Sequence, residues 1–225
     1  MEWRTQVYLA VGFAVLITAA TIAAAVFSRG DVGADTFTAT EVPALTSADW
    51  TRGSEIATVT LTEYGDFECP ACAQYEPIIA RLVEEYGDRM RFGFRQFPLY
   101  PIHRHAEAAA RAAEAAGLQD KYWEMHGVLY AKQAMWSAAK DTNESRELFK
   151  NYAREIGVDP LRFAVDLDSR VVTDKIESDV ATGRAADVDH TPTFFLNGKQ
   201  IPNPQNYEQF KSILDVALAT TTNAQ

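Results

Sequence analysis

The chain has 225 residues, of which 47% are hydrophobic and 23% are charged, and its formal net charge at pH 7 is −10. This composition is typical of a globular protein and excludes a disordered or fibrous chain. The acidic balance argues against a nucleic-acid partner, because binding to phosphates requires clustered lysine and arginine side chains.

The first predicted element is a membrane-spanning helix over residues 7–27, which leaves a cytoplasmic stub at residues 1–6. This segment carries no charged residue, and about 20 apolar residues in a helix cross the core of a bilayer. A cleaved signal peptide is the alternative, because small residues at 23–25 can form a cleavage site, although its apolar region is usually only ~7–15 residues long. With either interpretation we expect an exported domain on the extracytoplasmic side of the cell membrane.

A linker is predicted over residues 28–49, because this stretch is rich in small and polar residues and has no periodicity. The folded domain is predicted over residues 50–219 and is followed by a short tail at residues 220–225.

The domain begins with a predicted strand over residues 57–64, in which β-branched residues alternate. Glu63 falls on the same face of this strand as Val59 and Leu61. Its carboxyl group is therefore either buried with an apolar stripe or points to solvent at the strand end.

A helix is predicted over residues 70–86, because apolar residues recur at helical spacing, with a kink at Pro77 and an end at Gly87. A second strand is predicted over residues 90–97. Strand, helix and strand in this order form a βαβ unit, so we expect the two strands to pair in parallel.

Helices are predicted through residues 103–184, with Asp120, Asn143 and Asp159 as candidate N-terminal caps and a further helix over residues 169–182. A hairpin follows, because Asn197-Gly198 between two apolar runs is typical of a type I′ turn. A last helix is predicted over residues 207–219. The order of elements is a βαβ half, a helical insertion and a ββα half.

Cys69 and Cys72 are the only cysteines of the sequence, and three interpretations of this pair compete. A structural disulfide is compatible with export, but a bridge across so short a loop removes little chain entropy. A copper or zinc site needs further nitrogen or sulfur ligands; there is no second CxxC, and His190 is the candidate third ligand. We therefore expect neither a metal nor another cofactor.

A redox pair is the interpretation that the local context favours. Cys69 is predicted at the start of a helix, where free backbone amides and the positive end of the helix dipole stabilise a thiolate. Such positions lower the pKa of a thiol from ~8.5 to ~3.5–7.5, and Pro70 suits the first helical position. Cys72, one turn further, is expected to be less exposed and to be the resolving thiol of a reversible Cys69–Cys72 disulfide.

Three stretches, VTLTEYGDFECPAC, RFGFRQFPL and HTPTFFLNG, together with the order of elements, resemble the DsbA-like thiol–disulfide oxidoreductases. The likeness implies a thioredoxin-like α/β fold, with a central mixed sheet and an all-helical subdomain inserted at about residues 103–184. It also implies that Pro192 is a cis-proline beside the CxxC and that Thr191 presents backbone groups to an extended substrate. Glu63, six residues before Cys69, matches an acid of the family that exchanges a proton with the inner cysteine.

His190 departs from the family pattern, because many relatives have a small residue at this position. It is either a surface or packing residue, or it lies near the sulfurs in the substrate-binding loop and favours the Cys69 thiolate. His103, His105, Trp123 and Trp136 are expected to be helix-start and core residues.

These features predict a membrane-anchored, extracytoplasmic thiol–disulfide oxidoreductase that acts on the thiols of exported proteins and is recharged by a membrane redox partner. We favour an oxidase over a reductase, which would carry the same motif, or an isomerase, which usually has a dimerisation region. Pro70-Ala71 lacks the basic residue of the strongest oxidants, so we expect an intermediate redox potential. A copper or zinc chaperone that uses Cys69, Cys72 and His190 is the alternative from another class.

Overall fold

The structure is a computed structural model that describes residues 41–222. The predicted cytoplasmic stub, the anchor at residues 7–27 and most of the predicted linker lie outside the described residues, as does the end of the tail. Within residues 41–222, no helix has both the length and the apolar character needed to cross a membrane.

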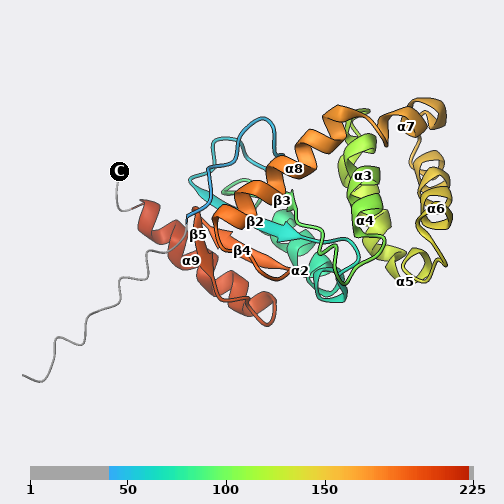
Figure 1. Ribbon diagram of the computed structural model, residues 1–225. Helices are drawn as coiled ribbons and strands as arrows, with labels where there is room; N and C mark the ends of the chain where they lie inside the picture. The colour runs from blue at the N-terminus through green and yellow to red at the C-terminus, as the bar shows by residue number, and fades with distance from the viewer. Residues whose placement is uncertain (1–40, 223–225) are drawn as a thin grey trace, which may run out of the picture. The chain divides into compact units, whose positions relative to one another are not determined.

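A five-stranded mixed sheet forms the centre of the fold (Figure 1), in the order β1-β3-β2-β4-β5. Strands β2 and β3 pair in parallel, as the βαβ pattern predicts, and the other neighbours are antiparallel. The strands are β1 (Trp50–Gly53), β2 (Val59–Gly65), β3 (Met90–Gln96), β4 (Thr193–Leu196) and β5 (Lys199–Ile201).

Helices cover both faces of the sheet, and several more helices form an insertion between β3 and β4 (Figure 1). Helices α2 (Pro70–Tyr86), α8 (Arg170–Ala185) and α9 (Tyr207–Thr222) pack against the sheet. The remaining helices are α3 (Ala106–Gly117), α4 (Tyr122–Ala131), α5 (Gln133–Trp136), α6 (Thr142–Glu155) and α7 (Pro160–Asp166).

Side chains alternate between the two faces of the central strands, and their contacts show on which face each helix packs. Phe194 of β4 packs its ring against Tyr75 of α2 and Phe210 of α9, so these two helices share one face. Tyr64 of β2 lies on the opposite face, where its hydroxyl donates a hydrogen bond to Thr182 Oγ1 of α8 at 2.9 Å. Since side chains alternate along a strand, Glu63 points to the face of α2 and α9.

The helical insertion is built around the alanine-rich helix α3. Eight of its alanines are 3% exposed or less, and the helix contacts α4, α6, α7 and α8. Small side chains let several helices approach one axis closely, which gives a dense core without large residues. The fold thus contains the predicted helical insertion, with helices from Ala106 to Ala185 between β3 and β4.

Part of the predicted linker belongs to the folded domain. Val42 is buried, and its amide donates a hydrogen bond to the Gly198 carbonyl at 2.9 Å. Asp49 forms a buried ion pair with Arg95 of β3, with Oδ1 2.8 Å from Nε. The prediction was wrong for residues 41–49 because these contacts join distant parts of the chain and leave no local periodicity. Strand β1, which pairs with β3, was missed for the same reason.

Two predicted helix caps were wrong. Helix α6 is capped by Asp141 and not by Asn143, because Asp141 precedes the first helical residue and accepts a hydrogen bond from the Glu144 amide. Asp120 adopts a left-handed conformation with φ of 60°, and Lys121 occupies the cap position of α4. The cap at Asp159 and the I′-type hairpin are confirmed: Asn197 and Gly198 both have positive φ, at 48° and 83°.

Candidate active site

The two cysteines lie where β2 passes into α2. Strand β2 ends at Gly65, Cys69 is the N-cap residue of α2, and Pro70 occupies the first helical position, where its missing N–H costs no hydrogen bond. Cys69 is 7% exposed and Cys72, one turn further, is 1% exposed. Both are free thiols in this structure. The chain therefore places an outer and an inner sulfur at the start of one helix.

The outer sulfur is strongly acidic. The pKa of Cys69 is lowered to about 5, chiefly because the Cys72 thiol forms a hydrogen bond with the Cys69 sulfur. The Thr191 side chain and the backbone amides of Cys72 and Ala71 lower the pKa of Cys69 further, against the effect of burial. The amides at the helix start thus lower the pKa of Cys69, as the sequence predicts, but the Cys72 side chain has the largest effect on this pKa.

The inner sulfur has the opposite character. Burial raises the pKa of Cys72 well above its ordinary value, and the hydrogen bond with Cys69 and the charges of Glu63 and Cys69 raise it further. At neutral pH the pair therefore holds one thiolate, on Cys69, and one thiol, on Cys72. A thiolate is the attacking form of cysteine, so Cys69 is the sulfur of the pair that is suited to nucleophilic attack.

Glu63 is buried, as its register with the apolar stripe suggests, and is 3% exposed. It pairs with Phe94 of β3 on one side and with Phe194 of β4 on the other. Burial raises the pKa of Glu63 well above its ordinary value, and the charges of Glu76 and Cys69 add to this effect. A protonated carboxyl group therefore lies on the α2 face of the sheet and interacts electrostatically with Cys72.

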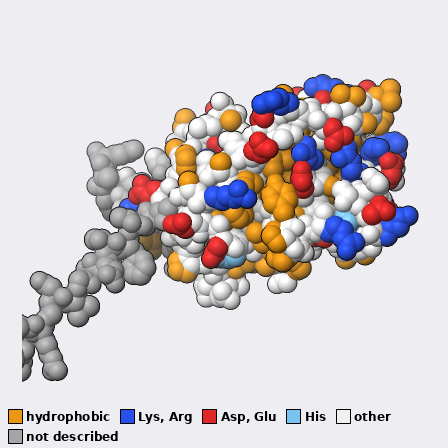
Figure 2. All heavy atoms as spheres, viewed as in Figure 1, with side chains coloured by type: hydrophobic (Ala, Val, Ile, Leu, Met, Phe, Trp, Pro, Cys, Tyr) orange, Lys and Arg blue, Asp and Glu red, His pale blue; other side chains and the backbone are white. Residues whose placement is uncertain are grey.

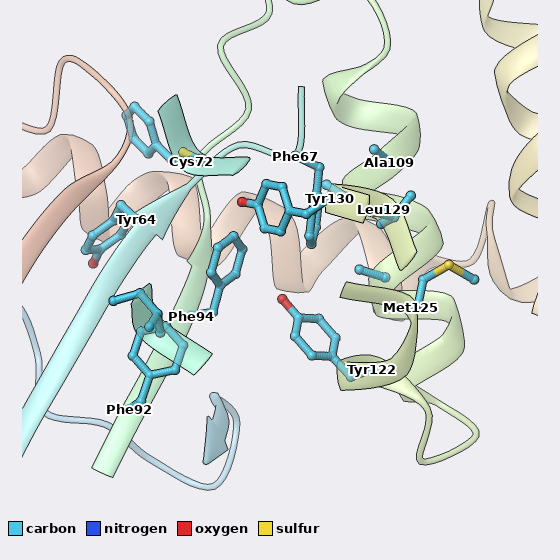
Figure 3. Close-up of a cluster of buried hydrophobic side chains, with 14 of the residues drawn as sticks. Tyr64, Phe67, Cys72, Phe92, Phe94, Ala109, Tyr122, Met125, Leu129 and Tyr130 are labelled. Carbon is cyan, nitrogen blue, oxygen red and sulfur yellow. The ribbon is translucent and has the colours of Figure 1, made fainter. Parts of the chain in front are cut away.

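An aromatic cluster separates this part of the sheet from the insertion. Figure 3 shows Phe67, Phe94 and Tyr130 between the central strands and the helices of the insertion, with Cys72 near the end of the sheet. The Phe67 ring stacks on Phe94 at 5.4 Å and contacts Tyr130 at 5.0 Å between ring centroids. Apolar rings exclude water, and the low local dielectric strengthens the electrostatic effects on Cys72 and Glu63.

The predicted proline loop lies against the outer sulfur. The Thr191–Pro192 peptide bond is cis, and Cys69 Sγ lies 3.3 Å from the Thr191 carbonyl oxygen, to which it donates a hydrogen bond when it is a thiol. Asn203 Nδ2 donates a hydrogen bond to the Pro192 carbonyl at 2.7 Å. The structure thus brings Thr191 and Pro192 together with the CxxC, although they are about 120 residues away in the sequence.

His190 is exposed, and its Nδ1 lies 2.7 Å from Asp189 Oδ1. The imidazole is therefore paired with a neighbouring surface acid, which matches the interpretation of this residue as a surface histidine. Among residues 41–222 there is no group of three or more histidine, cysteine or acidic side chains that could hold a metal ion.

Two residues beside the cysteines were not recognised as part of the site. Asp66 is buried, and its carboxylate oxygen Oδ2 lies 2.7 Å from His103 Nδ1. His103 was expected only at a helix start, but helix α3 begins at Ala106 and His105 is its N-cap residue. The signal in the sequence was Asp66 itself, an acid three residues before Cys69. The structure shows that most of the surrounding segment is buried.

Comparison with known proteins supports this fold. The thioredoxin family model matches residues 46–216. The solved structure of a thioredoxin-like oxidoreductase from Silicibacter pomeroyi is 26% identical, with a TM-score of 0.65, and the match covers 76% of this chain and 93% of that one.

Two further structures show the same fold at lower identity. BdbD from Bacillus subtilis has a TM-score of 0.69 at 23% identity, over 80% of this chain and 98% of that chain. The alpha-DsbA1 protein of Wolbachia pipientis has a TM-score of 0.71 at 18% identity, over 80% and 96% of the two chains.

Curated relatives include two proteins named as antiporters. The Na(+)/H(+) antiporter NhaA 3 of Salinispora tropica is 37% identical over 179 residues, which cover 80% of this chain and 26% of the relative. NhaA of Herminiimonas arsenicoxydans is 34% identical over 188 residues, or 84% and 28% of the two chains. The chain therefore spans about a quarter of the length of the curated relatives it matches.

Proposed function

The chain belongs to the thioredoxin family, with the helical insertion of its DsbA-like members, and on this basis we propose that it is an oxidase of exported protein thiols. The observation that carries the proposal is the contrast between the two sulfurs. The pKa of Cys69 is about 5, whereas that of Cys72 is raised well above the ordinary value. Cys69 is suited to act as a nucleophile and as a leaving group in its thiolate form, whereas Cys72 is suited to remain a protonated thiol.

The oxidase begins its cycle with a Cys69–Cys72 disulfide. A substrate thiolate attacks Cys69 Sγ, the new sulfur–sulfur bond forms, and the electron pair of the old bond leaves on Cys72, which takes a proton from Glu63. A second substrate thiolate then attacks the substrate sulfur that is bound to Cys69. The substrate is oxidised to a disulfide, and Cys69 leaves as a thiolate.

The acidity of Cys69 supports this direction of electron flow. A leaving thiol of low pKa departs faster, and a stabilised thiolate favours the reduced protein, which makes the disulfide form a stronger oxidant. The absence of a basic residue at positions 70 and 71 supports a potential between those of thioredoxin, ~−270 mV, and DsbA, ~−120 mV.

A groove beside the CxxC suits an extended, partly apolar substrate segment. It is lined by residues that include Glu68, Tyr100, Ile102 and Arg104. Ile102 is 72% exposed and Tyr100 is 44% exposed, and Glu68 adjoins Cys69 in the chain. The Thr191 backbone, which lies against the Cys69 sulfur, would pair with the same segment as an added strand.

The cellular setting is part of the same proposal. The uncharged segment at residues 7–27 supports a single-pass membrane anchor with the catalytic domain outside the cytoplasm. A membrane redox partner would restore the Cys69–Cys72 disulfide after each cycle. Alkaline extraction of membranes, with protease treatment of intact cells, would test both the anchor and its orientation.

The decisive experiment measures both potential and turnover. Purified protein is equilibrated with glutathione buffers to obtain the potential of the Cys69–Cys72 couple, and the oxidised form is mixed with a reduced, unfolded protein. We expect stoichiometric oxidation of substrate thiols and a potential above about −250 mV. A potential below this value would favour a reductase, and bound copper or zinc without dithiol turnover would favour a metal chaperone.

A further inference from the structure

The loop between β3 and α3, residues 97–105, is joined by hydrogen bonds to the active-site turn. The Leu99 amide donates a hydrogen bond to Asp66 Oδ2 at 2.8 Å, and the His105 amide donates one to Glu68 Oε2 at 2.6 Å. These bonds hold the segment that contains His103 against the residues that immediately precede Cys69. The position of His103 is therefore set by the same turn that presents the outer sulfur.

Asp66 is built to orient the His103 ring. Its side chain has no exposed surface, and Oδ1 accepts a hydrogen bond from the Glu68 amide at 2.7 Å. Oδ2 accepts from the Leu99 amide and lies 2.7 Å from His103 Nδ1. The Asp66 carbonyl also accepts a hydrogen bond from the Cys69 amide at 3.1 Å. One buried residue thus connects the histidine to the nucleophile.

The His103 ring combines access to solvent with a defined orientation. Its side chain is 16% exposed, and the flanking residues Ile102 and Arg104 both line the groove beside the CxxC. The hydrogen bond to Asp66 raises the pKa of His103, against burial, and the charges of Asp66, Cys69 and Glu68 raise it further. Because Nδ1 is paired with Asp66, Nε2 is the nitrogen that can exchange a proton with a bound substrate.

We propose that His103, oriented by Asp66, is the general base that deprotonates the incoming substrate thiol. This role rests on the proposed thiol oxidation. Neutral His103 takes the proton of the substrate thiol at Nε2, the substrate thiolate attacks Cys69 Sγ, and the Cys69–Cys72 bond breaks. The electron pair leaves on Cys72, which is protonated by Glu63, so charge and protons balance across the step.

The same proton serves the second half of the reaction. After the first step His103 is an imidazolium that interacts electrostatically with Cys69, with Asp66 as its counter-ion. When the second substrate thiolate attacks, the sulfur–sulfur bond between substrate and Cys69 breaks and its electron pair leaves on Cys69. The cation stabilises this thiolate and then returns its proton to water. Asp66 is a positioning residue, because it acts through His103.

The size of the expected effect follows from the ionisation of the substrate. About 3% of a thiol with a pKa of ~8.5 is ionised at pH 7, so a base can accelerate the first step by at most ~30-fold. We expect His103→Gln to slow that step about tenfold at pH 7 and to have no effect at pH 9, where the substrate is already a thiolate. If His103→Gln were slow only because its structure is disturbed, the step would be slow at both pH values.

Three variants separate the roles of base and charge. His103→Arg keeps a cation but cannot accept a proton, so it should lose the rate at pH 7 while the pKa of Cys69 stays low. His103→Gln should lose the rate and also raise the pKa of Cys69. Asp168→Asn is the matched control, because it removes a carboxylate that pairs with Arg146 on the surface of the insertion, and it should behave as the wild type.

The measurement is stopped-flow reaction of oxidised protein with a reduced dithiol peptide between pH 6 and pH 9, with alkylation of the reduced protein for the pKa of Cys69. If the wild type oxidises the peptide and His103→Gln shows the same pH profile, the role of His103 would be overturned, but the proposed function would stand. A wild type that does not oxidise any dithiol would overturn the proposed function itself.

Discussion

Replacing Cys72 by alanine is expected to raise the pKa of Cys69 from about 5 to between ~6 and ~7. The hydrogen bond from the Cys72 thiol is the largest cause of the low value, and a hydrogen bond to a charged group contributes ~1.5–3 kcal/mol. Each pKa unit corresponds to about 1.4 kcal/mol, so the loss of this bond is worth one to two units. Cys72→Ser keeps an O–H donor at the same position and should shift the pKa of Cys69 by less.

The assay is the rate of alkylation of Cys69 by iodoacetamide across a pH series. The alanine variant has a single cysteine, so its titration reports one group, and in the wild type the raised pKa of Cys72 keeps that thiol silent below pH 8. A pKa that stays at about 5 in Cys72→Ala would refute the role of the inner thiol. A rise to about 8.5, the value of free cysteine, would refute any contribution from the helix start.

The same acidity predicts how the stability of the reduced protein depends on pH. The pKa of Cys69 is depressed in the folded state, so its contribution to the free energy of unfolding is complete above the unfolded value of ~8.5 and is lost as pH falls through about 5. At pH 7 the contribution is about 3 kcal/mol. The difference in free energy of unfolding between reduced wild type and Cys69→Ala, measured with urea, should therefore grow in favour of the wild type between pH 5 and pH 8.

Three further changes test other parts of the site and the core. Thr191→Val should raise the pKa of Cys69 by less than Cys72→Ala does, because the Thr191 side chain favours the thiolate less than Cys72 does, and an unchanged alkylation profile would contradict this. Glu63→Gln should slow attack by Cys72 on a mixed disulfide at least ~100-fold, measured with a glutathione adduct of Cys69; wild-type rates would exclude a proton relay. The pKa of Glu114 is raised by burial to about 7, so the contribution of Glu114 to stability should fall by about 3 kcal/mol between pH 4.5 and pH 7. Glu114→Gln should remove that fall in urea titrations, and an unchanged slope would refute the assignment.

Local patterns in the sequence were sufficient for the parts of the fold that depend on neighbouring residues. Alternation of apolar residues located β2, and helical spacing located α2 with the bounds Pro70–Tyr86. The dipeptide Asn197-Gly198 located the hairpin, because both residues tolerate positive φ. The position of the CxxC between a strand and a helix was enough to place Cys69 at the helix start, where free backbone amides favour a thiolate.

Tertiary structure decided the features that depend on residues far apart in the chain. Residues 41–49 are folded because Asp49 meets Arg95 of β3, a contact that leaves no local pattern. The pairing of Asp66 with His103 joins two loops, and the burial of Asp66 that orients the ring is provided only by the completed fold. The acidity of Cys69 likewise combines a nearby helix start with a thiol and a distant threonine. Short-range geometry follows from the order of residues, whereas electrostatics at a buried site depends on every element that excludes water from it.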